Sequence, residues 1–92
     1  MNVQEIAKKI TLNVSNKFGI SKTGISFDSS FQSIGANSID IVEIILDMEN
    51  EFKINVPDSK LVMMKSVGTL AKYIDTSLNS KPKRKYTKKL NY

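Results

Sequence analysis

One serine stands where its hydroxyl could carry a phosphate-linked group. Ser38 follows a flexible glycine, Gly35, and a good capping residue, Asn37, and it begins a stretch with helical periodicity. The first turn of a helix leaves backbone N–H groups without intrahelical acceptors, and these groups favour a phosphate. The local sequence therefore permits a modified serine, although a plain capping serine explains it as well.

The chain contains no histidine and no cysteine. It therefore has no Ser–His or Cys–His couple, it forms no disulfide, and it lacks the Cys and His ligands of a typical zinc site. A reactive Ser38 would have no histidine base in the same chain, so its chemistry would have to come from another protein. We predict that the protein is not an enzyme.

The element that precedes this serine is a helix followed by a long connection. Apolar residues recur at steps of three and four from Val3 to Phe18, Asn2 and Glu5 stand in capping-box positions, and Gly19 suits the residue after the helix end. Residues 20–36 form a connection that is long for a small domain, so we expect it to be functional or pinned by its own side chains. Its apolar residues are Ile20, Ile25, Phe27, Phe31 and Ile34.

The helix that would present the serine is predicted to run from Ser38 to Phe52. Asn37 is its expected N-cap, and Asp40 favours the positive end of the helix dipole. Its apolar residues cover more than the single stripe that a surface helix needs. We infer that this helix is buried on two sides or leaves apolar residues exposed for a partner.

The remainder of the domain is predicted to be helical as well. Residues 53–57 should be extended, with Asp58 or Ser59 capping a short helix over residues 60–64, and residues 66–78 should form the last helix. The fold class that follows is all-α, a bundle of four helices with a long first loop and a short third helix.

Charge divides the chain into a domain at residues 1–80 and a tail at residues 81–92. The first part holds eight lysines and nine acidic residues, about −1 in all, whereas the tail holds five lysines, one arginine and no acid, about +6. We predict that the tail is a disordered, solvated extension. The alternative is that the tail binds a nucleic acid or an anionic membrane, since clustered cations attract phosphates.

The residues around Ser38 resemble the attachment motif of acyl carrier proteins, Leu-Gly-x-Asp-Ser-Leu, at the start of the second helix. Segments farther along the chain resemble that family in the same order, and the resemblance covers residues 3–78. The matching stretches are Ile34-Gly35-Ala36-Asn37-Ser38-Ile39, Val42-Glu43-Ile44-Ile45-Leu46, Glu49-Asn50-Glu51-Phe52, Ile54-Asn55-Val56-Pro57-Asp58 and Ser66-Val67-Gly68-Thr69-Leu70-Ala71-Lys72-Tyr73-Ile74.

This resemblance implies a carrier of acyl groups. Ser38, next to Asn37 and near Gly35, would bear 4′-phosphopantetheine through a phosphodiester, and the thiol of that group would hold acyl groups as thioesters for fatty acid or related lipid or polyketide biosynthesis. An aminoacyl or peptidyl carrier is the alternative. Asn37 stands where the family usually has Asp, which removes a negative charge beside the serine but keeps an equally good cap.

The resemblance also implies partners and a cargo pocket. The partners would be a phosphopantetheinyl transferase of the holo-acyl carrier protein synthase type, together with acyl-loading, synthase and acyltransferase enzymes. The predicted partner-binding residues are Ile39, Asp40, Glu43, Leu46 and Asp47, although such charges usually form a solvated face. The predicted acyl-chain pocket consists of core residues: Met48, Val62, Met63, Leu70 and Ile74.

The location and assembly of the protein are expectations from its sequence. No segment is long and apolar enough to span a membrane, and Glu5, Lys8 and Lys9 interrupt any signal-peptide pattern. We expect a cytoplasmic monomer that binds no nucleic acid and does not insert stably into membranes.

Overall fold

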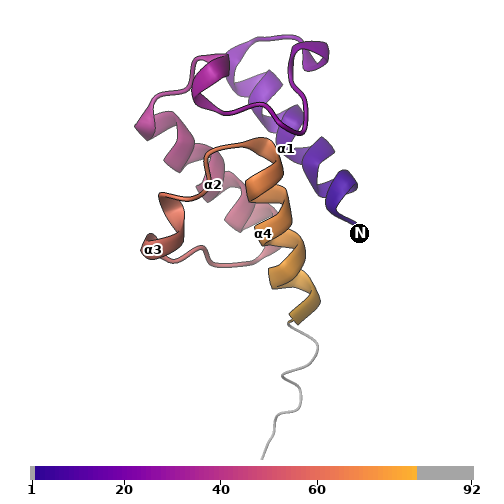
Figure 1. Ribbon diagram of the computed structural model, residues 1–92, viewed down its shortest axis with the longest axis vertical. Helices are drawn as coiled ribbons and strands as arrows, with labels where there is room; N and C mark the ends of the chain where they lie inside the picture. The colour runs from indigo at the N-terminus through magenta and orange to yellow at the C-terminus, as the bar shows by residue number, and fades with distance from the viewer. Residues whose placement is uncertain (1, 81–92) are drawn as a thin grey trace, which may run out of the picture.

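The structure, a computed structural model, describes residues 2–80, so the predicted tail at residues 81–92 lies outside the described residues. Within residues 2–80 the chain forms four α-helices and no strand, which confirms the predicted all-α class (Figure 1). The helices are α1 (Val3–Phe18), α2 (Ser38–Phe52), α3 (Asp58–Leu61) and α4 (Val67–Ser80), and two short 3-10 turns, η1 (Lys22–Gly24) and η2 (Gln32–Ile34), lie between α1 and α2.

Helix α1 begins and ends where its capping residues predict. The side chain of Asn2 accepts a hydrogen bond from the backbone N–H of Glu5 at 2.9 Å, and the Asn2 N–H donates to the Glu5 carboxylate at 3.0 Å. At the other end Gly19 has a φ of +67°, a left-handed conformation that glycine adopts without strain.

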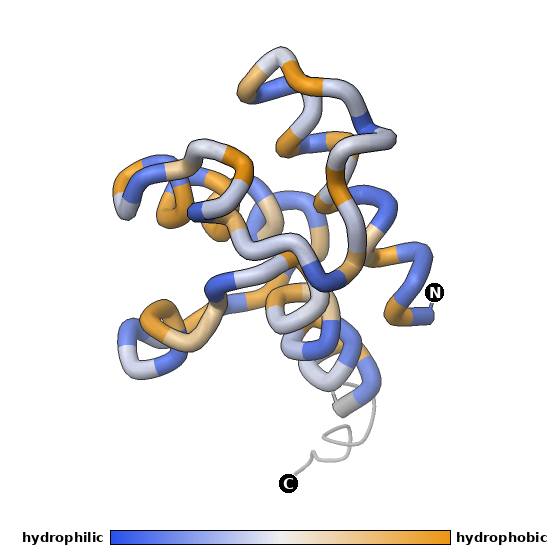
Figure 2. Tube along the Cα trace, turned by 45° about the horizontal axis from the view of Figure 1, so that its top comes forward, coloured by the Kyte–Doolittle hydropathy of each residue, from blue (hydrophilic) through white to orange (hydrophobic). Residues whose placement is uncertain are grey.

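The core lies where α4 packs against both α1 and α2. Figure 2 shows hydrophobic and hydrophilic residues alternating every few positions along the chain, as amphipathic helices require. The largest fully buried side chains come from all three long helices and from the connection between α1 and α2: Ile6, Ile10, Val14, Phe31, Ile44, Ile45, Val67, Leu70 and Ile74.

The connection between α1 and α2 is pinned to the domain, as predicted. The side chain of Phe31 is fully buried, and the Phe31 N–H donates to the Lys65 carbonyl at 2.9 Å. Farther back, the N–H of Gly68 donates to the carbonyl of Phe27 at 2.8 Å. A Cβ atom at Gly68 would lie 2.9 Å from that carbonyl oxygen, so a glycine is needed for α4 to approach the connection this closely.

The third helix differs from its prediction. The helix was expected over residues 60–64 with a side-chain cap from Asp58 or Ser59, but α3 begins at Asp58 and has no side-chain cap. The N-cap residue is Pro57, whose carbonyl accepts from the N–H of Lys60 at 2.8 Å. The proline ring fixes the φ of Pro57, which is −65°. The helix therefore begins directly after Pro57, two residues before the start that the polar capping residues suggested.

Two smaller boundaries also differ. Lys53 was expected to be extended, but it closes α2 in a left-handed conformation with φ +57° and ψ +47°. Ser66 was expected to be the first helical residue of α4, but its hydroxyl instead accepts from the N–H of Thr69 at 3.1 Å, in the manner of an N-cap.

Candidate functional site

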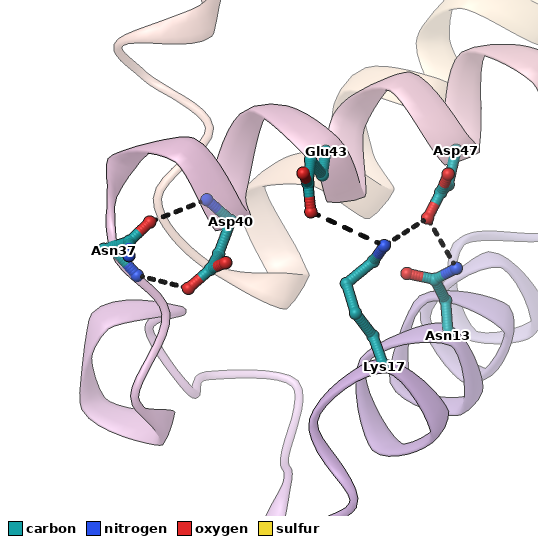
Figure 3. A network of polar contacts seen from close by, with 6 residues as sticks. All are labelled: Asn13, Lys17, Asn37, Asp40, Glu43 and Asp47. Atoms are coloured by element: carbon teal, nitrogen blue, oxygen red, sulfur yellow. Dashed lines mark hydrogen bonds and ion pairs between the residues drawn. The ribbon is translucent and has the colours of Figure 1, made fainter.

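Ser38 is the first residue of α2, and its position is set by a reciprocal pair of hydrogen bonds. The Asn37 side chain accepts from the N–H of Asp40 at 2.8 Å, and the Asn37 N–H donates to the Asp40 carboxylate at 3.0 Å (Figure 3). This capping box confirms Asn37 as the predicted N-cap. Because both bonds go to the backbone on either side of Ser38, its own side chain is left exposed.

The chain reaches Ser38 through a turn that is attached to the core. Gly35 has a φ of +97°, which favours glycine, and its N–H donates to the Gln32 carbonyl at 3.1 Å. The next residue, Ala36, is buried and donates to the carbonyl of Phe31 at 3.0 Å. The exposed Ser38 therefore follows a segment whose direction is determined by the buried Phe31.

An apolar groove opens beside Ser38, between α2 and α3. We call it the α2–α3 groove; its volume is about 540 Å³, and it is lined by Ser38, Ile41, Val42, Ile45, Asp58, Leu61, Val62, Met64 and Lys65. A second hollow of about 400 Å³ shares Ser38, Ile41 and Lys65 with it. Ser38 thus stands at the meeting point of two hollows, with one cationic side chain lining both.

Two residues of the predicted acyl-chain pocket are not buried as expected. Val62 and Met63 were expected in the core, but they are 71% and 55% exposed. Helix α3 spans four residues, so it cannot bury every apolar side chain in and after it, and Met64 is the one that points into the core. Of the predicted pocket residues, only Val62 lines the α2–α3 groove, whereas Met48, Leu70 and Ile74 are buried in the core.

Five apolar residues of the α2–α3 groove are not among the predicted pocket residues: Ile41, Val42, Ile45, Leu61 and Met64. Ile41 and Ile45 follow Ser38 at three- and four-residue steps, so they lie on the same side of α2 as the serine. That spacing was present in the sequence and could have identified them. Leu61 and Met64 could not be assigned in this way, since their position depends on how α3 packs.

The predicted partner-binding face of α2 carries exposed apolar residues among its acids. Ile39 and Leu46 are 71% and 52% exposed, and Val42, which was not predicted, is 41% exposed. These side chains interrupt an otherwise charged surface, as expected if a helix keeps apolar residues for a partner.

Two of the predicted partner-binding acids contact α1. The Lys17 Nζ atom lies 3.2 Å from the Asp47 carboxylate and 3.9 Å from the Glu43 carboxylate. Asn13 donates from its side-chain amide to the same Asp47 oxygen at 3.1 Å (Figure 3). Asp40 takes no part in this network, since its carboxylate belongs to the capping box.

The residues around Ser38 fit a phosphopantetheine group. The exposed hydroxyl is a point of attachment, the unpaired N–H groups of the first helical turn and Lys65 favour a phosphate, and the groove offers apolar walls for the arm. In residues 2–80 no group of three or more acidic, His or Cys side chains could hold a metal ion. Nor is any helix in that range long and apolar enough to cross a membrane.

Comparison with known proteins bears on the family of the chain. The profile of the phosphopantetheine attachment site matches residues 8–74. The chain is 39% identical over 70 residues to an acyl carrier protein of Clostridium acetobutylicum, covering 75% of this chain and 91% of that protein. It is 35% identical over 80 residues to one of Lactobacillus johnsonii, covering 86% and 100%.

Solved structures share the fold. The crystal structure of an acyl carrier protein from Thermotoga maritima superposes with a TM-score of 0.76 at 21% identity, over 87% of this chain and 94% of that one. The acyl carrier protein of Enterococcus faecalis gives 0.71 at 26% identity, over 84% and 99%. Because the profile spans most of the chain and full-length relatives exceed 30% identity, the chain belongs to the acyl carrier protein family, whose prosthetic group is 4′-phosphopantetheine.

Proposed function

We propose that Ser38 is the attachment residue for 4′-phosphopantetheine, through a phosphodiester, and that the chain carries acyl groups for fatty acid or related lipid or polyketide biosynthesis. The observation that carries the proposal is the exposed Ser38 hydroxyl at the start of α2, at the mouth of an apolar groove. When bound, the prosthetic group supplies a thiol at the end of a flexible arm, on which acyl groups are held as thioesters.

The chain's own residues would position the attachment site. The hydrogen bonds between Asn37 and Asp40 hold the backbone on both sides of Ser38, so the hydroxyl is presented in one place to a modifying enzyme. The positive end of α2 and the Lys65 side chain favour the negative charge of a phosphodiester.

Apolar side chains would shelter the rest of the arm and its cargo. Ile41 and Leu61 come from opposite sides of the α2–α3 groove, and both are partly buried. The buried Met48, Leu70 and Ile74 remain predicted contacts of an acyl chain, and methionine adapts well to changing contents.

Acyl carrier proteins are carriers, and we extend this role to the chain. It has no histidine or cysteine to act as base or nucleophile, so attachment and acyl transfer would be performed by partner enzymes. These are a phosphopantetheinyl transferase and the enzymes that load, extend or remove the acyl group. Weak contacts steered by charge suit such a carrier, because each partner must release it quickly.

Intact-mass spectrometry tests the proposal directly. The unmodified chain is incubated with a phosphopantetheinyl transferase and coenzyme A, and we expect the mass of one phosphopantetheine to be gained. Ser38→Ala should abolish the gain, while Ser33→Ala, which removes another exposed hydroxyl in the same region, should leave it unchanged. An equal gain in Ser38→Ala would move the attachment site elsewhere.

A further inference from the structure

The acidic face of α2 is not uniformly available to a partner. Glu43 and Asp47 both lie within 4 Å of the Lys17 ammonium group, at 3.9 Å and 3.2 Å. Asp40 differs from these two acids. Its carboxylate forms no ion pair with any residue in the described part of the chain, and it accepts a hydrogen bond only from the backbone N–H of Asn37. Figure 3 shows Lys17 extending from α1 to a place between the two acids, while Asp40 lies nearer the amino-terminal end of α2.

The position of Lys17 is held by more than one contact. It lies in the last turn of α1, where a cation is stabilised by the helix dipole, and its side chain is only 27% exposed. Asn13, one turn earlier on α1, donates to Asp47 on the same side. The Asp47 carboxylate therefore faces two α1 donors, and it remains 40% exposed.

A partner's arginine or lysine would meet a different electrostatic environment at Asp40 than at Glu43 and Asp47. At Asp40 it would find an unneutralised carboxylate, whereas at Glu43 and Asp47 it would approach a cation that already occupies the space between them. Two like charges near one carboxylate repel, so the partner's cation must displace Lys17 or share its acids.

We propose that Lys17 is an internal competitor for proteins with a basic docking face. Its single positive charge offsets part of the negative charge of Glu43 and Asp47 in the free chain, so a partner cation that approaches these two acids is opposed by the Lys17 ammonium group. This inference rests on the proposed function, because it concerns the partners that would act at Ser38.

The test is a direct binding measurement on the unmodified full chain. The probe is a phosphopantetheinyl transferase of the holo-acyl carrier protein synthase type with a basic docking face, titrated without coenzyme A. Lys17→Met removes the charge and keeps most of the unbranched apolar side chain. We expect the Kd to fall by about two- to fivefold at low ionic strength, which is the scale of an exposed ion pair. This gain in affinity should shrink as the salt concentration rises from about 0.01 M to about 0.15 M, because the electrostatic screening length falls from about 30 Å to about 8 Å.

The chain offers a matched control. Lys9 also lies on α1 and pairs with an acid of α2, Glu51, at 3.5 Å. Lys9→Met removes the same charge, but Glu51 lies near the carboxyl end of α2, outside the predicted partner-binding residues. We expect a clearly smaller change in Kd for Lys9→Met than for Lys17→Met. Equal gains in the two variants would show that only net charge matters and would overturn the proposal.

Unchanged or weaker binding by Lys17→Met would also overturn it, since Lys17 would then orient the acids instead of competing for them. If Lys17→Met does not fold, Lys17→Gln replaces it, because glutamine is uncharged and its side-chain amide is a hydrogen-bond donor. Asp47→Asn gives a second measurement: competition predicts a larger loss of affinity in the uncharged background than in the native one, and an equal loss contradicts it.

Failure of this inference can be told apart from failure of the proposed function. Mass gain at Ser38, abolished in Ser38→Ala, reports on attachment alone. Normal attachment with equal Kd values for the native chain and Lys17→Met overturns only the competitor. Tighter binding by Lys17→Met without any mass gain supports Lys17 as a competitor and overturns Ser38 as the attachment residue.

Discussion

The two ends of α2 are held in different ways. At the amino end, Asn37 and Asp40 exchange hydrogen bonds with backbone N–H groups, and the intervening Ile39 side chain is 71% exposed. At the carboxyl end the apolar side chains of Met48 and Phe52 are 4% and 9% exposed. Capping by two polar side chains leaves the intervening side chains of Ser38 and Ile39 exposed, whereas burial at the carboxyl end uses the apolar side chains themselves.

Polar residues follow the same division. Glu49, an acid in the carboxyl half of α2, bonds within the domain: its carboxylate accepts from the N–H of Val56 at 2.6 Å. This bond ties the segment after α2 back to the helix. Met48, Glu49 and Phe52 in the carboxyl half of α2 therefore serve the fold, while the amino end carries the candidate site.

The largest effect on stability is expected at the carboxyl end. Phe52→Ala should lower the free energy of unfolding by about 3–5 kcal/mol, since it leaves a cavity in the core. Ile39→Ala, at the amino end, should change it by less than about 0.5 kcal/mol because the side chain is mostly exposed. Urea denaturation of the two variants measures both values. Similar losses would remove the contrast between the ends.

Loss of the Glu49 bond should cost less. Glu49→Ala should destabilise the domain by about 1–3 kcal/mol, because the N–H of Val56, a buried residue, loses its acceptor. Glu49→Gln keeps an acceptor oxygen and should recover part of that loss. The modification rate at Ser38 should be unaffected in both variants, measured at a temperature where each is folded. A slowed rate would show that Glu49 also contributes to partner binding.

At the amino end, a change of charge should affect rate more than stability. Asn37→Asp should leave the thermal melt nearly unchanged, because Asp and Asn cap helices about equally well. It should speed modification by a general fatty-acid-type transferase, since it restores a negative charge beside Ser38. Initial rates from intact-mass spectrometry test this. A rate that is unchanged or slower would mean that the transferase does not use the charge at residue 37.

The smallest effect is expected from removing residues 81–92. The apolar periodicity of the chain ends at Leu78, so the truncated protein should keep its melting temperature and its modification at Ser38. Differential scanning calorimetry and modification rates compare the two chains. A fall of several degrees would show that these residues contact the domain and would contradict their prediction as a solvated extension.

The sequence by itself determined the features that depend on neighbours along the chain. Helices α1 and α2 have the predicted bounds, because the three- and four-residue apolar steps and the capping residues Asn2, Asn37 and Gly19 act within one or two turns. The fold class followed from the same periodicities. The spaced motifs around Ser38 indicated the family, and the comparisons confirmed it.

Only the tertiary structure decided which side chains meet across the bundle. Val62 and Met63 are as hydrophobic as core residues, yet they are exposed because α3 is too short to bury them. Ile41 and Leu61 form groove walls only once α3 has packed near α2. The pairing of Lys17 with Glu43 and Asp47 likewise depends on how α1 lies beside α2, since residues so far apart in sequence are brought together by packing and not by any local pattern.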